Sequence, residues 1–358
     1  MRRRVIYVGA GLAIAAGVGA LVPKARASGG SGGGVPIPTG AAAVSYAPVG
    51  MGKFNQPMPR FDVLPRNAVS TLTPAPLEQS NQAQQAVDPA LGGGFGPIEG
   101  RPPGPLWAHQ GWTKFPPQVA IDVSMEGAKI NTTYNPGVPA SLNSGINPAT
   151  PFHPRFHPTL PDQTATKMWT FNGTLPPKLV IGRYGEALLF REHNKLPVDP
   201  KANGGFGINS ISTHEHNGHH GAENDGFTGA FFFPNQFYDY HWPILLAGFS
   251  SINQTATDPK AGSPNDDGTI KQVAGDWHET MSTHWFHDHM FSFTSQNVYK
   301  GMAGMFNIYS ALDRGNEAID DGVNLRLPSG TAKTWGNLDY DVNLMLADKA
   351  WDPQFPAQ

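Results

Sequence analysis

The sequence contains no cysteine among its 358 residues. A chain without cysteine forms no disulfide bonds and offers no thiolate to a metal ion, so a metal site within it must use nitrogen and oxygen ligands. Charged residues are also scarce, at 15%, whereas 42 glycines and 34 prolines are present. This composition argues against long helices and indicates short strands joined by loops.

Clusters of basic residues are absent after Arg26. Residues 1–27 contain five basic and no acidic side chains, and the rest of the chain has 20 basic and 28 acidic residues, a net charge of about −8. Because phosphate binding requires clustered lysine and arginine, this balance argues against nucleic acid as a partner.

The N-terminus has the features of an export signal. Three arginines at positions 2–4 precede an apolar run over residues 5–22, and Ala25-Arg26-Ala27 places small residues at a cleavage site. We therefore expect residues 1–27 to be a cleaved signal peptide and the mature protein to be periplasmic or secreted, by the Sec or the twin-arginine route. A membrane anchor is the alternative, because the apolar run is nearly long enough to span a bilayer.

Four segments of different composition follow this leader. Residues 28–104 are a Gly/Pro-rich low-complexity segment, which buries too little apolar surface to fold alone. Residues 105–164 mix proline with aromatic residues, and we expect an irregular N-terminal extension there. We expect a β domain over residues 165–315. Residues 316–358 should be the incomplete start of a second β domain, since they are too few to bury a core.

Short apolar runs bounded by turn residues characterise the expected β domain. Three of them lie at residues 167–171, 178–181 and 187–190. Strands of this length at close intervals are typical of an all-β sandwich or barrel. Residues 298–309 fit a helix or a strand, and the two glycines within them favour a strand.

Histidines gather in two clusters, at residues 213–220 and 284–289. Side chains two apart on a strand share a face, so each cluster can present a pair of imidazoles in one direction. Imidazole is a preferred ligand for copper, zinc, iron and nickel, and two converging pairs could hold more than one ion. The pairs are His214 with His216, and His287 with His289.

The remaining residues of the clusters fall outside the two pairs. Trp285 and Phe286 are expected to shield the site from water. His284 is out of phase with the second pair, and we expect it outside the ligand set or exposed. His219 and His220 follow Gly218, and we expect them to lie in a loop as auxiliary residues of the metal site.

Taken together, these motifs resemble the first cupredoxin domain of multicopper oxidases, in particular the bacterial laccase and bilirubin-oxidase type. The resemblance extends over residues 165–350, and the second histidine motif with the segment after it is its most specific part. It rests on residues 171–173, 185–186, 194–197, 214–218, 225–226, 285–289 and 297–304, together with Pro176.

The resemblance implies a cupredoxin-like Greek-key β-sandwich over residues 165–315 and the start of a second cupredoxin domain after it. It also implies copper ions that form a trinuclear cluster, which reduces dioxygen to water with electrons from an oxidised substrate. Asp225 would orient the ligands or pass protons. His214 would bind the type 2 ion, and His216, His287 and His289 would bind the type 3 pair.

Two departures from the family pattern matter. The later motifs His-x-x-His-x-His and His-Cys-His are absent, so this chain supplies half of the trinuclear ligands and cannot bind a type 1 copper through cysteine. We expect it to be inactive alone and to require missing C-terminal cupredoxin domains or a complementary chain. The electron donor stays open between phenols, pigments and metal ions. Glu215 within the first motif and Asn217 after it are unusual.

Two other functions fit parts of the sequence. An exported copper-binding module without catalysis needs only the four histidines. A zinc hydrolase is suggested by residues 213–219, which resemble the His-x-His-x-Asp-His motif of metallo-β-lactamases. Gly218 stands where that motif requires aspartate, and the αββα alternation of that fold is not evident.

Overall fold

The computed structural model describes residues 61, 63–73, 76, 115–128, 130–131, 168–175, 178–222, 224–244, 251–278, 283–327 and 343–347. The expected signal peptide, most of the low-complexity segment and much of the expected second domain lie outside these residues. Within the part described, no helix has the length and hydrophobicity needed to cross a bilayer.

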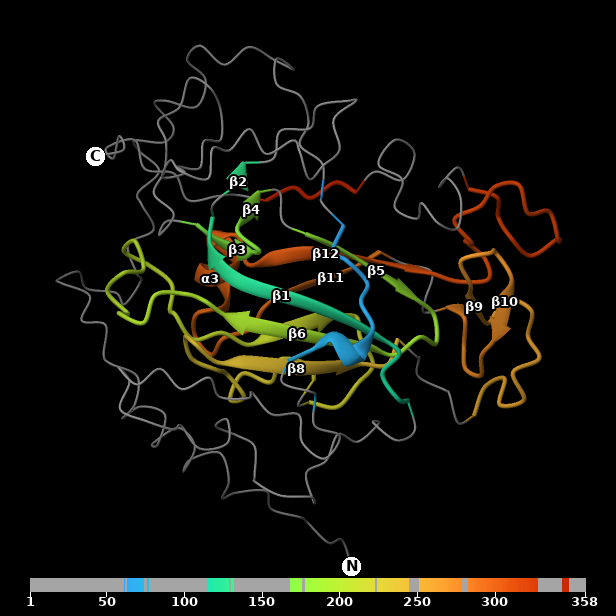
Figure 1. Cartoon of the computed structure of the whole chain (residues 1–358), viewed down its shortest axis with the longest axis horizontal. Helices are drawn as coiled ribbons and strands as arrows, with labels where there is room; N and C mark the ends of the chain where they lie inside the picture. Colours follow the sequence, from blue (N-terminus) through green and yellow to red (C-terminus); the bar gives the residue numbers. More distant parts are fainter. Residues whose placement is uncertain are drawn as a thin grey trace, which may run out of the picture.

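Two four-stranded sheets form the body of the protein (Figure 1). In the first sheet, β1 pairs with β3 in antiparallel and with β6 in parallel orientation, and β6 pairs with β8 in antiparallel orientation. Its spatial order is β3 (Trp169–Phe171), β1 (Val119–Gly127), β6 (Leu188–Asn194) and β8 (Phe237–Trp242).

The second sheet carries both histidine motifs. Its strand β11 pairs in antiparallel orientation with β12 and β7, and β12 pairs in parallel with β5. Strand β7 therefore lies at one end of the sheet. The spatial order is β5 (Leu179–Arg183), β12 (Ala303–Tyr309), β11 (Thr283–Asp288) and β7 (Thr213–His216).

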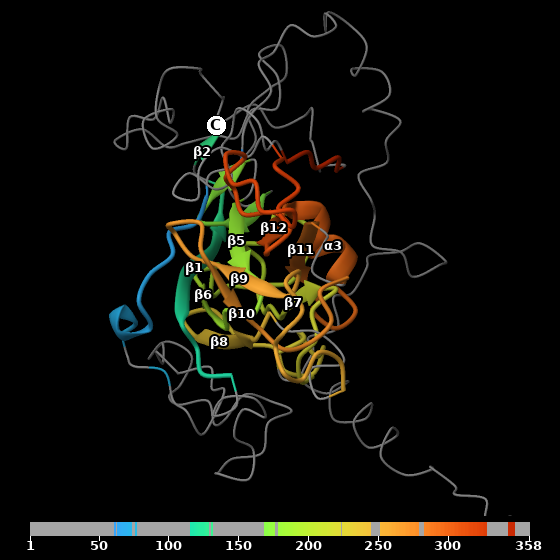
Figure 2. The ribbon, with the colours of Figure 1, turned by 90° about the vertical axis from the view of Figure 1, so that its right-hand side faces the viewer.

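Smaller elements surround these sheets. Helix α3 (Thr294–Lys300) lies beside β11 and β12, as Figure 2 shows. Within the described residues, two further sheets have two strands each, and the 3-10 turn η1 precedes β1. The small elements are η1 (Val69–Thr71), β2 (Ile130–Asn131), β4 (Thr174–Leu175), β9 (Gly262–Pro264) and β10 (Ile270–Gln272).

Aromatic rings join the two large sheets. Phe190 of β6 stacks on Trp242 of β8 with ring centroids 4.7 Å apart. Phe286 of β11 meets Phe190 edge-on at 5.3 Å, and Phe306 of β12 lies 6.1 Å from Trp242. All four side chains are fully buried, and such aromatic pairs contribute to the core beyond their buried area. The predicted all-β fold, a cupredoxin-like sandwich, is confirmed.

Strand β1 corrects one local expectation. It lies within residues 105–164, which were expected to be irregular, yet it is a regular strand paired along seven residues with β6. Val119, Ile121 and Val123 all point into the core. This two-residue alternation is present in the sequence, but proline-rich flanks obscure it. The sandwich therefore recruits a strand from before residue 165.

The stretch 298–309 is only partly the strand that was expected. Its first residues belong to helix α3, which ends at Lys300; Gly301 follows with φ of 128°, and strand β12 begins at Ala303. A glycine at this φ permits the abrupt change from helix to strand, because residues with a side chain rarely adopt it. Gly304 lies against the Phe286 ring, which leaves no space for a side chain there.

Candidate metal centre

The pairing of β7 with β11 brings the two histidine motifs together. His214 lies opposite His287, and His216 lies opposite Trp285. Directly paired residues of antiparallel strands point to the same side of a sheet, so these four rings share one face. The intervening pair, Glu215 and Phe286, points to the other face, where Phe286 belongs to the core.

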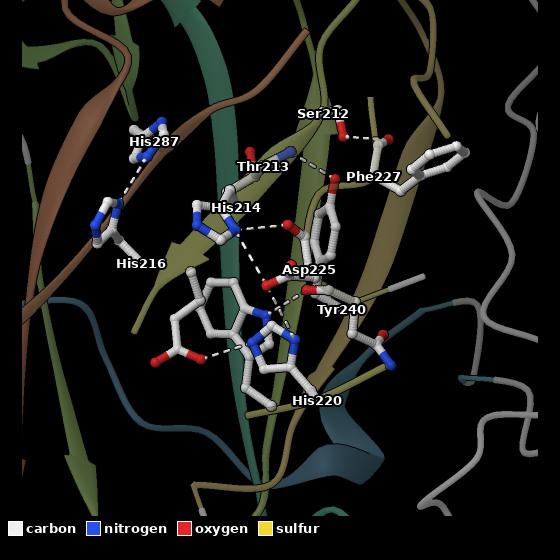
Figure 3. Close-up of polar contacts among 12 residues, drawn as sticks. Ser212, Thr213, His214, His216, His220, Asp225, Phe227, Tyr240 and His287 are labelled. Atoms are coloured by element: carbon white, nitrogen blue, oxygen red, sulfur yellow. Dashed lines mark hydrogen bonds and ion pairs between the residues drawn. The ribbon is translucent and has the colours of Figure 1, made fainter. Parts of the chain in front are cut away.

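All four predicted ligands converge at this face. The His214 ring centroid lies 5.4 Å from that of His216, 5.2 Å from that of His287 and 5.1 Å from that of His289. His289 follows the end of β11, and its backbone N–H donates to the Ser212 carbonyl beside β7. Figure 3 shows His214, His216 and His287 turned toward one another.

The nitrogen atoms of the cluster suit a metal ion. One ring nitrogen from each of His214, His216 and His287 lies within 4.8 Å of the other two. An ion about 2 Å from each nitrogen would bring them to within about 4 Å of one another, which small ring rotations achieve. The buried Nδ1 of His289 has no hydrogen-bond partner among the described residues. An all-imidazole set fits copper or zinc.

Asp225 fixes the orientation of the His214 ring. The Nδ1 atom of His214 lies 2.6 Å from the Asp225 backbone carbonyl and 3.1 Å from its Oδ1. A carbonyl only accepts, so Nδ1 carries the proton and the other ring nitrogen, Nε2, is left to face a ligand. The residue predicted to orient the ligands therefore contacts one of them.

Gly226 allows the Asp225 loop to come this close. Its φ of 70° is in the left-handed region, and a β-carbon at this position would lie 2.6 Å from the Thr213 carbonyl oxygen. Only glycine avoids both problems at once. On its other side the loop is fastened to β8, because the indole N–H of Trp242 donates to the Asn224 carbonyl at 3.0 Å.

Burial and mutual repulsion disfavour the charged form of most of the imidazoles. Burial, together with the neighbouring histidines, lowers the pKa of His287 to about 4. The pKa values of His216 and His289 are lowered for the same reasons. Burial opposes the charged form of His214 as well, but its hydrogen bonds to Asp225 outweigh this and raise its pKa. Neutral rings offer the lone pair that a metal ion needs.

Trp285 covers the cluster, as predicted, whereas Phe286 does not. The Trp285 indole stacks on the His216 ring at 4.8 Å and on the His287 ring at 4.3 Å. Such a cover limits the access of water to the imidazoles. Phe286 points into the sandwich instead, because adjacent residues on a strand alternate between faces.

Behind the cluster, on the core face of β7, Glu215 binds two further histidines. Its Oε2 lies 2.8 Å from His220 Nε2, and its Oε1 lies 3.0 Å from His284 Nδ1. His284 is buried and points away from the four imidazoles, so of the two places expected for it, outside the ligand set or exposed, it takes the first. Burial would raise the pKa of Glu215, but the two imidazoles lower it to about 2. The alternation of β7 places Glu215 opposite to the ligands; its partners could not be read from the sequence.

A second buried carboxylate fixes the end of β11. Asp288 accepts hydrogen bonds from the Ser212 N–H at 3.1 Å, the Met290 N–H at 3.0 Å and the Asn297 side-chain amide at 3.0 Å. These bonds connect β11 to the segment before β7 and to helix α3. Burial raises the pKa of Asp288 to about 7. The residue between His287 and His289 thus anchors the backbone from which both imidazoles project.

Two curated relatives are similar to this chain, and both are named laccase. The protein from Bacillus stratosphericus is 26% identical over 199 residues, which are 53% of this chain and 31% of the relative. The protein from Haloferax volcanii is 26% identical over 211 residues, or 57% of this chain and 30% of the relative. The chain therefore spans about a third of the length of these relatives, and the resemblance to multicopper oxidases is confirmed over about half of it.

No family model matches the chain. Among solved structures, a multicopper oxidase from Campylobacter jejuni aligns with a TM-score of 0.32 at 15% identity, over 55% of this chain and 26% of the other. A multicopper oxidase from Pseudomonas thermotolerans aligns with a TM-score of 0.30 at 13% identity, over 55% of this chain and 31% of the other.

Proposed function

We propose that this chain is the N-terminal cupredoxin part of a multicopper oxidase and supplies half of the ligands of a trinuclear copper cluster. The type 2 ion would be held by His214, and the type 3 pair by His216, His287 and His289. The observation that carries this proposal is the convergence of these four imidazoles, from β7 and from β11 and its C-terminal end, on one face of the sheet.

The residues of this chain would bind and orient rather than transform a substrate. The Nδ1–H of His214 is held by Asp225, so its Nε2 is presented to an ion in a fixed direction. Asp225 is half exposed, and its carboxylate is placed to exchange a proton between water and the edge of the site. Bound copper would supply the electron transfer that reduces dioxygen to water.

Completion of the site would require groups that this sequence does not contain. A type 1 copper needs a cysteine thiolate, and no cysteine is present. We propose that further C-terminal cupredoxin domains or a complementary chain provide this thiolate and the remaining histidines. The electron donor would be a phenol, a pigment or a metal ion. The leader over residues 1–27 would direct the protein to the periplasm or the exterior.

A copper-binding module without catalysis is the second candidate. Three ring nitrogens of this chain alone lie within 4.8 Å of one another, which is enough to hold an ion without any partner. Both candidates predict copper binding by the isolated chain. They differ only in what happens when the missing domains are supplied.

Copper titration of the purified chain, with and without a candidate C-terminal partner, tests the proposal. We expect the chain alone to bind copper without the blue absorbance of a thiolate-bound ion and without oxidising phenols. Added partner should raise the copper stoichiometry and permit phenol oxidation. Steady phenol turnover by the isolated chain would contradict the proposal, and a preference for zinc in metal analysis would favour the hydrolase.

A further inference from the structure

A line of side chains connects the core of the sandwich to His214. It begins at His284, passes to the Glu215 carboxylate and continues to His220, both through hydrogen bonds. The Nδ1 atom of His220 makes no hydrogen bond among the described residues, but it lies 3.7 Å from Asp225 Oδ1, within the range of an ion pair. The same Oδ1 lies 3.1 Å from His214 Nδ1. Figure 3 draws the contacts from His220 to Asp225 and from Asp225 to His214.

This line of side chains passes around the edge of the second sheet, at strand β7. Glu215 and His284 lie on the core face of the second sheet, whereas His214 lies on its outer face. Strand β7 is the last strand of that sheet, so the loop after it can fold from one face to the other. His220 and Asp225 both belong to this loop. The line of side chains thereby joins the buried Glu215 carboxylate to the candidate ligand His214 without passing through the sheet.

The sequence of the turn is adapted to this arrangement. Asn217 has φ of 78°, a left-handed conformation that asparagine tolerates better than most residues. A β-carbon at Gly218 would overlap both the Glu215 carboxylate and the His220 ring. The unusual residues of the first motif, Glu215 and Asn217, therefore belong to one feature, and Gly218 provides the space for it.

We infer that Glu215 and His220 are positioning residues, which hold the Asp225 carboxylate, and through it the His214 imidazole, in the orientation that metal binding requires. The effect of this positioning on copper binding rests on the proposed function, whereas its effect on the orientation of the His214 ring does not. The Glu215 side chain is 4% exposed and the His220 side chain 2% exposed, so both are held firmly by their surroundings. Neither imidazole leaves space for an ion beside Glu215, because both lie at hydrogen-bond distance.

His284 offers a matched control for His220. Both side chains are 2% exposed, and both bind Glu215, but only His220 approaches Asp225. We would compare His220→Phe and His284→Phe in the full chain with 15N-labelled histidine and no metal. The wild type should show His214 protonated at Nδ1. His220→Phe should shift the His214 Nδ1–H signal, because the Asp225 carboxylate beside it is released while the Asp225 backbone carbonyl keeps the tautomer. His284→Phe should keep the wild-type signal.

The same variants should then be titrated with Cu2+ alone. We expect His220→Phe to weaken copper binding about tenfold, the lower end of what the loss of a group supporting a metal ligand causes, and to change the hyperfine splitting of the Cu2+ spectrum. His284→Phe should stay within about twofold of wild type, since the ligand support is intact. If the wild type binds no Cu2+, the proposed function fails, but the His214 Nδ1–H signal still decides the inference.

The inference is overturned if the His214 Nδ1–H signal is the same in His220→Phe as in wild type, or if His284→Phe shifts it equally. Gly218→Ala provides a second route to the same result should His220→Phe not fold. The added methyl group would push against the Glu215–His220 pair without removing either partner. It should change the His214 signal in the direction of His220→Phe, and an unchanged signal would count against the inference.

Discussion

The two faces of β7 and β11 use histidine in opposite ways. On the outer face, His214, His216 and His287 surround a space that a metal ion can enter, and the carboxylate beside His214, that of Asp225, is half exposed. On the inner face, His220 and His284 bind a buried carboxylate. Histidines bonded to a buried carboxylate support the structure, whereas histidines that surround an open space and whose charged form is disfavoured, such as His216 and His287, are available for a ligand.

The largest expected effect is on metal uptake at the outer face. Replacing His214, His216, His287 and His289 together with alanine should abolish copper binding, because all candidate ligand nitrogens are removed. The melting temperature should change little, since these rings lie outside the aromatic core. Copper analysis after dialysis measures the first effect and circular dichroism the second. Unchanged copper uptake would show that the ion binds elsewhere.

The inner face should respond in the opposite way. Glu215→Ala removes the carboxylate that binds two buried imidazoles, and loss of one partner of a buried pair costs about 3 kcal/mol or more. Urea unfolding of Glu215→Ala should therefore show a large loss of stability. The control variant His216→Ala, whose side chain is half-buried on the outer face, should have a stability close to that of wild type. Equal loss in the two variants would contradict the distinction between the faces.

A second buried glutamate sharpens the comparison. Glu192 of β6 accepts a hydrogen bond from the Thr213 hydroxyl, and burial raises its pKa to about 8. Glu215 is equally buried, but its imidazole partners lower its pKa instead. The folded state thus keeps the Glu192 proton at a pH where the unfolded chain has lost it, so Glu192 should reduce stability as pH rises.

The measurement is urea unfolding of wild type and Glu192→Gln between pH 5.5 and 7.5. Over this range the contribution of Glu192 to the free energy of unfolding should fall by about 1 kcal/mol per pH unit. The glutamine variant should not show this pH-dependent fall. The difference between the two proteins should therefore grow with pH. A constant difference across the range would mean that Glu192 is ionised in the folded protein.

The smallest expected effect concerns the loop that joins the faces. Gly226→Ala forces a side chain into a left-handed conformation and against the Thr213 carbonyl, at a cost of about 1–2 kcal/mol. Copper affinity should fall as well, because Asp225 would move away from His214. Gly205→Ala is a suitable control, since its φ is also positive but nothing lies within 4 Å of the added carbon. Similar copper affinities in the two variants would contradict this account.

Much of the outer face could be predicted from the sequence. The two-residue spacing of His214 with His216 and of His287 with His289 required only that both segments be strands, and the structure pairs them. Strand β1 was missed because proline-rich sequence surrounds it, although its alternation of apolar residues was visible. The partners of Glu215 could not be predicted, since they depend on the path of the loop after β7 and on the pairing of β11. Long-range contacts of this kind leave no periodic signal.

One consequence concerns how this site could have diversified. The Glu215 carboxylate and the His220 ring fill the space that a side chain at position 218 would need, so Gly218 is not free to change alone. A relative with small residues at positions 215 and 220 would leave that space open, and its position 218 could accept a larger residue. We therefore expect substitutions at these three positions to be inherited together.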